Sequence, residues 1–207
     1  MNNESKLILS DEEQLLVNNT QWILTKRIII EKAMLLFGSM SQHMQAVIEK
    51  ESWLPEPVVR SSPKITRGEN YLQLPYVMLD YPRCFDADNI FAVRTMFWWG
   101  NFFSITLHLS GNYKKQFQQN ILNNLFSTKQ GFFICVHENQ WHHHFETGNY
   151  IPVDQLSGNE LNAIIAAKPF IKLAVRFPLH EWDHVITKLD GSFAEIVKML
   201  KDQLPRR

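Results

Sequence analysis

Residues 90–109 read IFAVRTMFWWGNFFSITLHL, and this stretch decides the fold. Aromatic and β-branched residues dominate both halves, which is typical of strands. The Gly100-Asn101 dipeptide between the halves favours a tight two-residue hairpin turn. The sequence therefore predicts two antiparallel strands, with Trp99 opposite Phe102 and Arg94 opposite Leu107.

This register predicts one face on which large rings alternate with hydroxyls and an imidazole, a composition typical of a pocket lining. Arg94 is predicted on the other, more aliphatic face, where a buried guanidinium requires either a carboxylate or an anionic ligand. The candidate carboxylates are Asp80, Asp86 and Asp88. A polar cross-strand ladder without a ligand is the alternative to a pocket. The predicted ligand-binding residues are Arg94, Thr95, Phe97, Trp99, Thr106 and His108.

The chain before this hairpin has the pattern of helices. Ser10 and Glu13 form a capping-box signature, and apolar residues follow at close to seven-residue spacing as far as Phe37. Gly38 is expected to end this helix, and a shorter helix follows it. We predict a flexible N-terminus over 1–9 and a helical hairpin over 10–51.

The remaining chain is divided between a connecting segment and the rest of the sheet. Residues 52–70 contain three prolines and no sustained periodicity, which predicts a connecting segment. Residues 71–207 are expected to form the sheet with its covering helices, including strands near 132–137, 141–146 and 171–177 and a last helix over about 180–204. The predicted fold is a single α+β domain over 1–207: an N-terminal helical hairpin followed by an antiparallel sheet with helices packed on one face.

The densest group of metal-ligand side chains lies within residues 137–146. On an extended strand His142, His144 and Glu146 point to one side, because side chains alternate. The pair His144 and Glu146, with His180 or His184 as a distant third ligand, would make the two-histidine, one-carboxylate set that holds non-haem iron. The alternative trio His137, His142 and His144 suits zinc. A solvated hairpin that binds nothing is the third interpretation.

Composition narrows the choice of function. The chain has 207 residues, 45% of them hydrophobic, and equal numbers of basic and acidic residues, 21 each. Zero formal net charge gives no support to nucleic-acid or anionic-membrane binding. Two cysteines without a paired spacing and no signal-peptide pattern predict a cytoplasmic protein. The sequence has no phosphate loop, dinucleotide fingerprint or nucleophile elbow.

Two functions follow from these observations. The first is a ligand-binding or protein-interaction module that uses an aromatic and histidine-rich sheet face, with a small molecule or a protein as partner. The alternative is a metal-dependent enzyme, either an iron oxygenase or a zinc hydrolase, built on the 142–146 cluster. An oxygenase would use Lys172 or Arg176 for an acidic cosubstrate. The apolar stripe of the first helix adds a homodimer as a further prediction.

Overall fold

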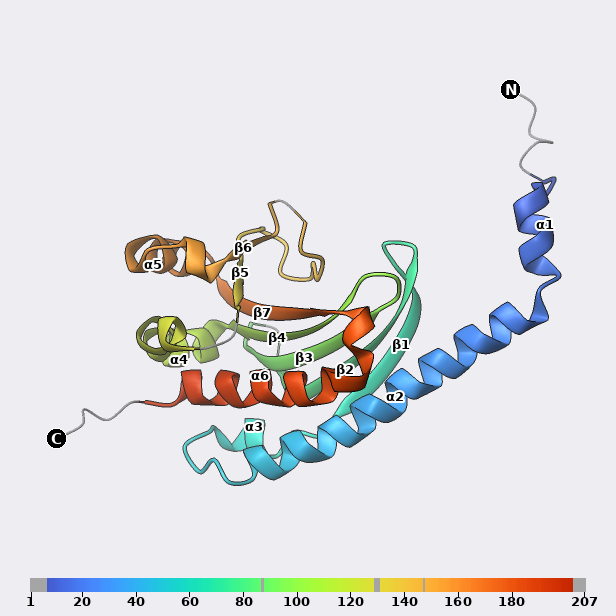
Figure 1. The fold of residues 1–207 in the computed structure, drawn as a ribbon. Helices are drawn as coiled ribbons and strands as arrows, with labels where there is room; N and C mark the ends of the chain where they lie inside the picture. The colour runs from blue at the N-terminus through green and yellow to red at the C-terminus, as the bar shows by residue number, and fades with distance from the viewer. Residues whose placement is uncertain (1–6, 87, 129–130, 147, 203–207) are drawn as a thin grey trace.

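The computed structural model describes residues 7–86, 88–128, 131–146 and 148–202. Within these residues an antiparallel sheet occupies the centre of the molecule, in the strand order β1-β2-β3-β4-β7-β5-β6 (Figure 1). Edge positions belong to β1 and β6. The strands are β1 (Lys64–Tyr71), β2 (Leu74–Phe85), β3 (Ile90–Trp98), β4 (Phe102–Ser110), β5 (Phe133–Cys135), β6 (Tyr150–Pro152) and β7 (Phe170–Pro178). The α+β class and the antiparallel sheet are confirmed.

Along the chain, helices come before the first strand, between strands and after the last strand. The α-helices are α1 (Asp11–Val17), α2 (Thr20–Ile48), α3 (Glu56–Val59), α4 (Gly111–Asn124), α5 (Gly158–Ala167) and α6 (Val185–Leu200). Short 3-10 segments are η2 (Leu125–Ser127), η3 (Val153–Gln155) and η4 (Leu179–His184). Within the described part of the chain, no helix combines the length and apolarity that crossing a membrane requires.

The β3–β4 hairpin differs from the predicted register by one residue. Trp98, not Trp99, lies opposite Phe102, so the turn contains three residues, 99–101. Gly100 adopts a φ of 72°, a conformation that glycine reaches without the steric cost of a side chain. Because side chains alternate along a strand, this slip changes which residues of β3 share a face with which residues of β4. Arg94 lies opposite Thr106 rather than Leu107.

The corrected register gives the sheet two different faces. Odd-numbered residues of β3 and β4, such as Phe97 and Phe103, belong to the main apolar core together with buried residues of α2, α4 and α6. Even-numbered residues face the opposite side, where Met96, Trp98 and Phe102 form a smaller cluster. We call this second side the polar face. Figure 1 shows α2 and α6 lying along one side of the sheet and the chain between β5 and β6 on the other.

The N-terminal helices do not form the predicted hairpin. The break falls at residues 18–19 rather than at Gly38, and the Asn19 side chain caps α2 by accepting a hydrogen bond from the Trp22 N–H. Gly38 lies inside α2, which continues to Ile48. A glycine inside a helix lowers stability only modestly, and packing of the adjacent turns outweighs that cost.

Three other predicted boundaries differ from the structure. Residues 56–59 and 64–71, assigned to the connecting segment, form α3 and the edge strand β1. Residues 141–146 form no strand. The last helix continues through Gly191 as α6 after the 3-10 turn η4. The predicted flexible N-terminus and the end of the predicted last helix fall partly in residues 1–6 and 203–207, outside the described residues.

Candidate functional site

The structure divides the predicted ligand-binding set between the two faces of the sheet. Arg94, Thr106 and His108 lie together on the polar face, because Arg94 pairs with Thr106 and His108 follows two residues later on β4. Thr95 and Phe97 point to the helix-covered face, where the Phe97 ring contacts Trp182 at 5.5 Å between centroids. Trp99 lies in the turn and packs against the main core. The register slip is the physical reason for this division.

Arg94 is held at the centre of an ion pair on the polar face. Its Nε and Nη2 groups donate to the two carboxylate oxygens of Asp80, at 2.7 and 2.9 Å. The predicted carboxylate partner of Arg94 is thus confirmed as Asp80. The third contact runs from Arg94 Nη1 to Nε2 of His143, at 3.1 Å. Because a guanidinium only donates hydrogen bonds, this nitrogen of His143 carries no proton.

A covering loop, residues 136–146, lies over the polar face and lacks regular secondary structure. The Tyr71 hydroxyl holds it by accepting hydrogen bonds from the backbone N–H groups of His143, at 2.6 Å, and His144, at 3.2 Å. The same hydroxyl lies 3.0 Å from Nδ1 of His144. Since it already accepts two hydrogen bonds, its own proton is directed to that nitrogen. Burial raises the pKa of Tyr71, so the hydroxyl stays protonated.

Two buried imidazoles connect the loop to the sheet. His108 on β4 bonds to the Gln140 side-chain oxygen at 2.8 Å, and its ring contacts Trp141 edge-on. Burial lowers the pKa of His108 to about 3, and the nearby charge of Lys172 adds to this effect. Burial likewise lowers the pKa of His143 well below its usual value. Both rings are therefore neutral at pH 7, as a water-poor site next to cations requires.

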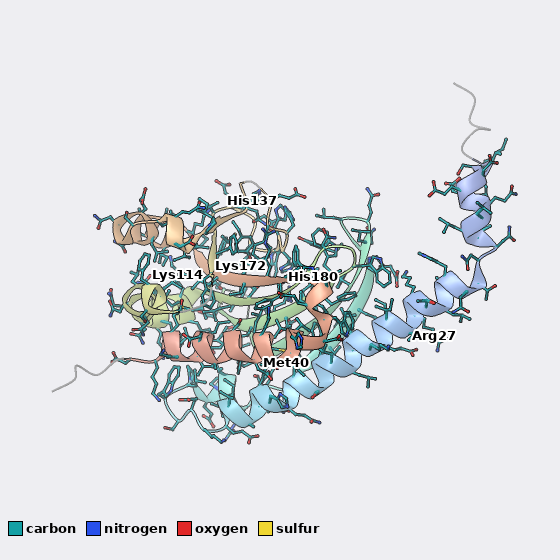
Figure 2. All side chains as sticks on the ribbon, viewed as in Figure 1. Arg27, Met40, Lys114, His137, Lys172 and His180 are labelled. Atoms are coloured by element: carbon teal, nitrogen blue, oxygen red, sulfur yellow. The ribbon has the colours of Figure 1, made fainter. Side chains whose placement is uncertain are left out.

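Lys172 on β7 is a buried cation of the polar face. It pairs across the strands with His108 and is only 1% exposed. Figure 2 labels Lys172 at the sheet, in the middle of the molecule. Its ammonium donates to the His142 carbonyl at 2.5 Å and lies over the Tyr150 ring, 5.6 Å from the centroid. No carboxylate among the described residues pairs with it. Burial lowers the pKa of Lys172 to about 8, which leaves it mostly protonated at pH 7.

A cleft of about 470 Å³ opens beside Arg94, between the covering loop and strands β1 and β2. Its walls are aromatic and its rim is cationic. The exposed side chain of Lys64 and the half-buried guanidinium of Arg83 face the same cleft as Arg94, whereas Asp80, already paired, is its only carboxylate among the described residues. The aromatic lining comes from Tyr71, Tyr76, Phe85 and Trp141.

The predicted metal ligands are not brought together around one point. The ring of His142 lies between those of His137 and His144, with centroids 4.4 and 5.0 Å apart and the ring planes tilted by 36° and 37°. His180 belongs to η4, whose Trp182 packs on the helix-covered face. Among the residues the structure describes, no group of three His, Cys, Asp or Glu side chains has the geometry to hold a metal ion. The strand that was to align His142, His144 and Glu146 is absent.

Sequence reasoning assigned no role to three residues that organise this site: Tyr71, Gln140 and His143. On the predicted strand, alternation would place His143 opposite His142 and His144, but it is the buried ring that contacts Arg94. Tyr71 lies 72 residues from its partner His143, so no local pattern connects them.

Comparisons with protein-family models, curated proteins and solved structures found no match.

Proposed function

We propose that this chain binds a small anionic molecule that carries an aromatic ring, in the cleft beside Arg94. The observation that carries the proposal is the charge of the polar face. Among the described residues, two largely buried cations, Arg94 and Lys172, lie there against a single buried carboxylate, Asp80. A buried charge without a counterion lowers stability, and such a residue is retained where an anion compensates it.

The composition of the cleft supports the same class of ligand. Lys64 and Arg83 add two cations at the rim, and neither makes an ion pair with a described residue. Tyr76 and Trp141 provide flat apolar surfaces, which suit an aromatic ring. Cations around an apolar-walled cleft favour a ligand with both an anionic group and a ring.

Calorimetric titration with phenyl phosphate tests this proposal, because the probe joins a phosphate to one ring. We expect the Lys64→Gln/Arg83→Gln variant to weaken binding at least tenfold, equivalent to about 1.4 kcal/mol. The matched control is Lys32→Gln, an exposed lysine of α2 outside the cleft, which should bind as the wild type does. Inorganic phosphate should bind more weakly than phenyl phosphate, since it offers nothing to the aromatic walls.

Lys172→Met separates a binding role of the buried cation from a structural one. The variant should unfold at the same or a higher temperature than the wild type while binding phenyl phosphate more weakly. Absence of any binding heat from the wild type, or equal affinities for wild type and the Lys64→Gln/Arg83→Gln variant, would overturn the proposal.

A further inference from the structure

The N-terminal helices extend beyond the body of the protein without an apolar surface to cover them. In Figure 1, α1 and the first turns of α2 project past the edge of the sheet. No residue of α1 is buried, and in α2 burial begins only at Ile30. Yet this overhang carries exposed apolar side chains: Leu15 is 74% exposed, and Trp22 and Ile23 are each about half exposed. A seven-residue helix is not stable alone in water, so α1 requires a surface on which to pack.

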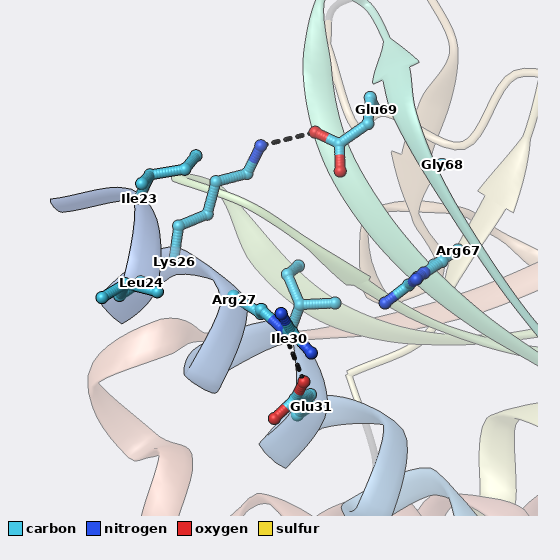
Figure 3. A pocket seen from close by; sticks show the side chains of 9 residues that line it. All are labelled: Ile23, Leu24, Lys26, Arg27, Ile30, Glu31, Arg67, Gly68 and Glu69. Carbon is cyan, nitrogen blue, oxygen red and sulfur yellow. Dashed lines mark hydrogen bonds and ion pairs between the residues drawn. The ribbon is translucent and has the colours of Figure 1, made fainter. Parts of the chain in front are cut away.

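A groove beside the overhang has the dimensions of such a surface. It has a volume of about 830 Å³ and lies between α2 and the edge strand β1 (Figure 3). Ile23, Leu24 and Ile30 supply its apolar lining from α2. On the other side, β1 is an edge strand, and its outward backbone groups have no neighbouring strand in the part of the chain that the structure describes.

Two ion pairs account for all but one of the described charged side chains that line the groove, and the remaining one is a cation. Lys26 pairs with Glu69 at 2.5 Å, and Arg27 pairs with Glu31 at 3.0 Å. Arg67 on β1 extends toward α2 in Figure 3 and makes no ion pair with any residue the structure describes. The groove therefore favours a segment that is apolar and acidic.

The segment of this chain that matches is α1 itself. Its first turn contains Asp11, Glu12 and Glu13, and its second turn contains the exposed Leu15 and Leu16. Acidic and apolar turns in this order complement the cation and the apolar lining of the groove. In the structure α1 points away from its own groove (Figure 1), and exchange between two copies buries both overhangs at once.

We propose that two copies of this chain form a two-fold dimer in which α1 of each copy packs into the groove between α2 and β1 of the other. Arg67 then pairs with the acidic turn of the partner's α1. Leu15 and Leu16 cover the apolar lining provided by Ile23 and Leu24. Each copy contributes the same two surfaces, as a closed two-fold interface requires.

Sedimentation equilibrium of the full chain measures the dimer directly. The wild type should sediment at twice the chain mass of 24.3 kDa at micromolar concentration. Leu15→Asp/Leu16→Asp should give a monomer that retains its fold, because both side chains are exposed. Phe126→Asp, which changes an exposed ring of η2 away from the groove, is the matched control and should remain a dimer. A wild type that stays monomeric, or a Leu15→Asp/Leu16→Asp variant that still dimerises, would refute the proposal.

Charge reversal tests the pairing itself. Arg67→Glu should raise the dissociation constant of the dimer at least tenfold, and adding Asp11→Arg/Glu12→Arg should restore it toward the wild-type value. Mixing a Glu12→Cys chain with a mass-tagged Arg67→Cys chain should give a disulfide between the two chains under mild oxidation. If α1 instead folds back into its own groove, the disulfide forms within one chain that carries both substitutions, and exchange is excluded.

Discussion

Strand β4 is buried on both sides, but the two sides are held in different ways. Phe103, Ile105 and Leu107 pack among helices and need only shape and apolar surface. Thr106 and His108 face a loop without regular structure, and directional bonds from the polar face fix that loop. Burial alone therefore does not identify a core. Groups that must be paired in one geometry distinguish the polar face from the apolar core.

The largest difference between the faces should come from truncating neighbouring rings. Phe103→Ala removes a fully buried ring that contacts Phe37 and Trp182, and we expect a loss of about 3–5 kcal/mol in the free energy of unfolding. Phe102→Ala on the polar face should cost less, because the covering loop can relax around the gap. Urea denaturation measures both values. Equal losses would show that the loop packs as rigidly as the helices do.

Breaking the ion pair of the polar face should lower the free energy of unfolding almost as much as Phe103→Ala does. Arg94→Met leaves the Asp80 carboxylate buried without its partner and should cost about 3 kcal/mol in the free energy of unfolding. Asp80→Leu/Arg94→Met removes both charges and should recover most of that loss. Urea denaturation of the wild type, Arg94→Met and Asp80→Leu/Arg94→Met measures these losses. A double variant no more stable than Arg94→Met would contradict the prediction.

Acid should lower the free energy of unfolding through the buried imidazoles of the polar face. The pKa of His108 is about 3 in the folded state against 6.5 as its ordinary value, so the unfolded chain binds more protons between these pH values. Stability is then fully present above pH 6.5 and falls toward pH 3, by up to about 1.4 kcal/mol per pH unit for this group. Buried His143 acts in the same direction. His108→Gln should reduce the slope of unfolding free energy between pH 6 and about 4.5; an unchanged slope would count against the neutral imidazole.

Replacing Lys172 should stabilise the protein. Its pKa of about 8 lies below the ordinary 10.5, so the unfolded chain binds more protons between these values and stability rises with pH across that window. Lys172→Met removes the buried charge and should add about 2 kcal/mol at pH 7. It should also abolish the rise between pH 8 and 10.5. A variant less stable than wild type at pH 7 would mean that its ammonium contributes more through the His142 carbonyl than its burial costs.

The smallest expected effect concerns the Thr95 hydroxyl, on the helix-covered face of β3. Thr95 is fully buried, and its hydroxyl has no hydrogen-bond partner among the described residues. Thr95→Val keeps the shape and removes the unpaired group, so we expect a gain of about 1 kcal/mol or less in the free energy of unfolding. Thr95→Ser is the control, since it keeps the hydroxyl and loses a methyl group. Thermal unfolding of the two variants should move in opposite directions.

Prediction from sequence succeeded where the signal is local. The β3–β4 hairpin, the strand near 171–177 and the Ser10 cap were all predicted from neighbouring residues, and each is present. The hairpin register was wrong because the two-residue turn expected at Gly100-Asn101 contains one residue more. That single residue placed Thr95 and Phe97 on the wrong face and Arg94 on the wrong side of the sheet.

The amino-acid sequence by itself determined the class of the fold, the presence of both hairpin strands and the need of Arg94 for a carboxylate or an anionic ligand. These follow from strand propensity and from the cost of burying a charge, which act at any position along the chain. Only the tertiary structure decided that Arg94, His108, His143 and Lys172 share one face. Their proximity depends on the order of strands in the sheet and on a loop fixed by Tyr71, 72 residues away from His143. Contacts between residues so distant along the chain leave no periodic pattern in it, because they form only when the whole sheet is assembled.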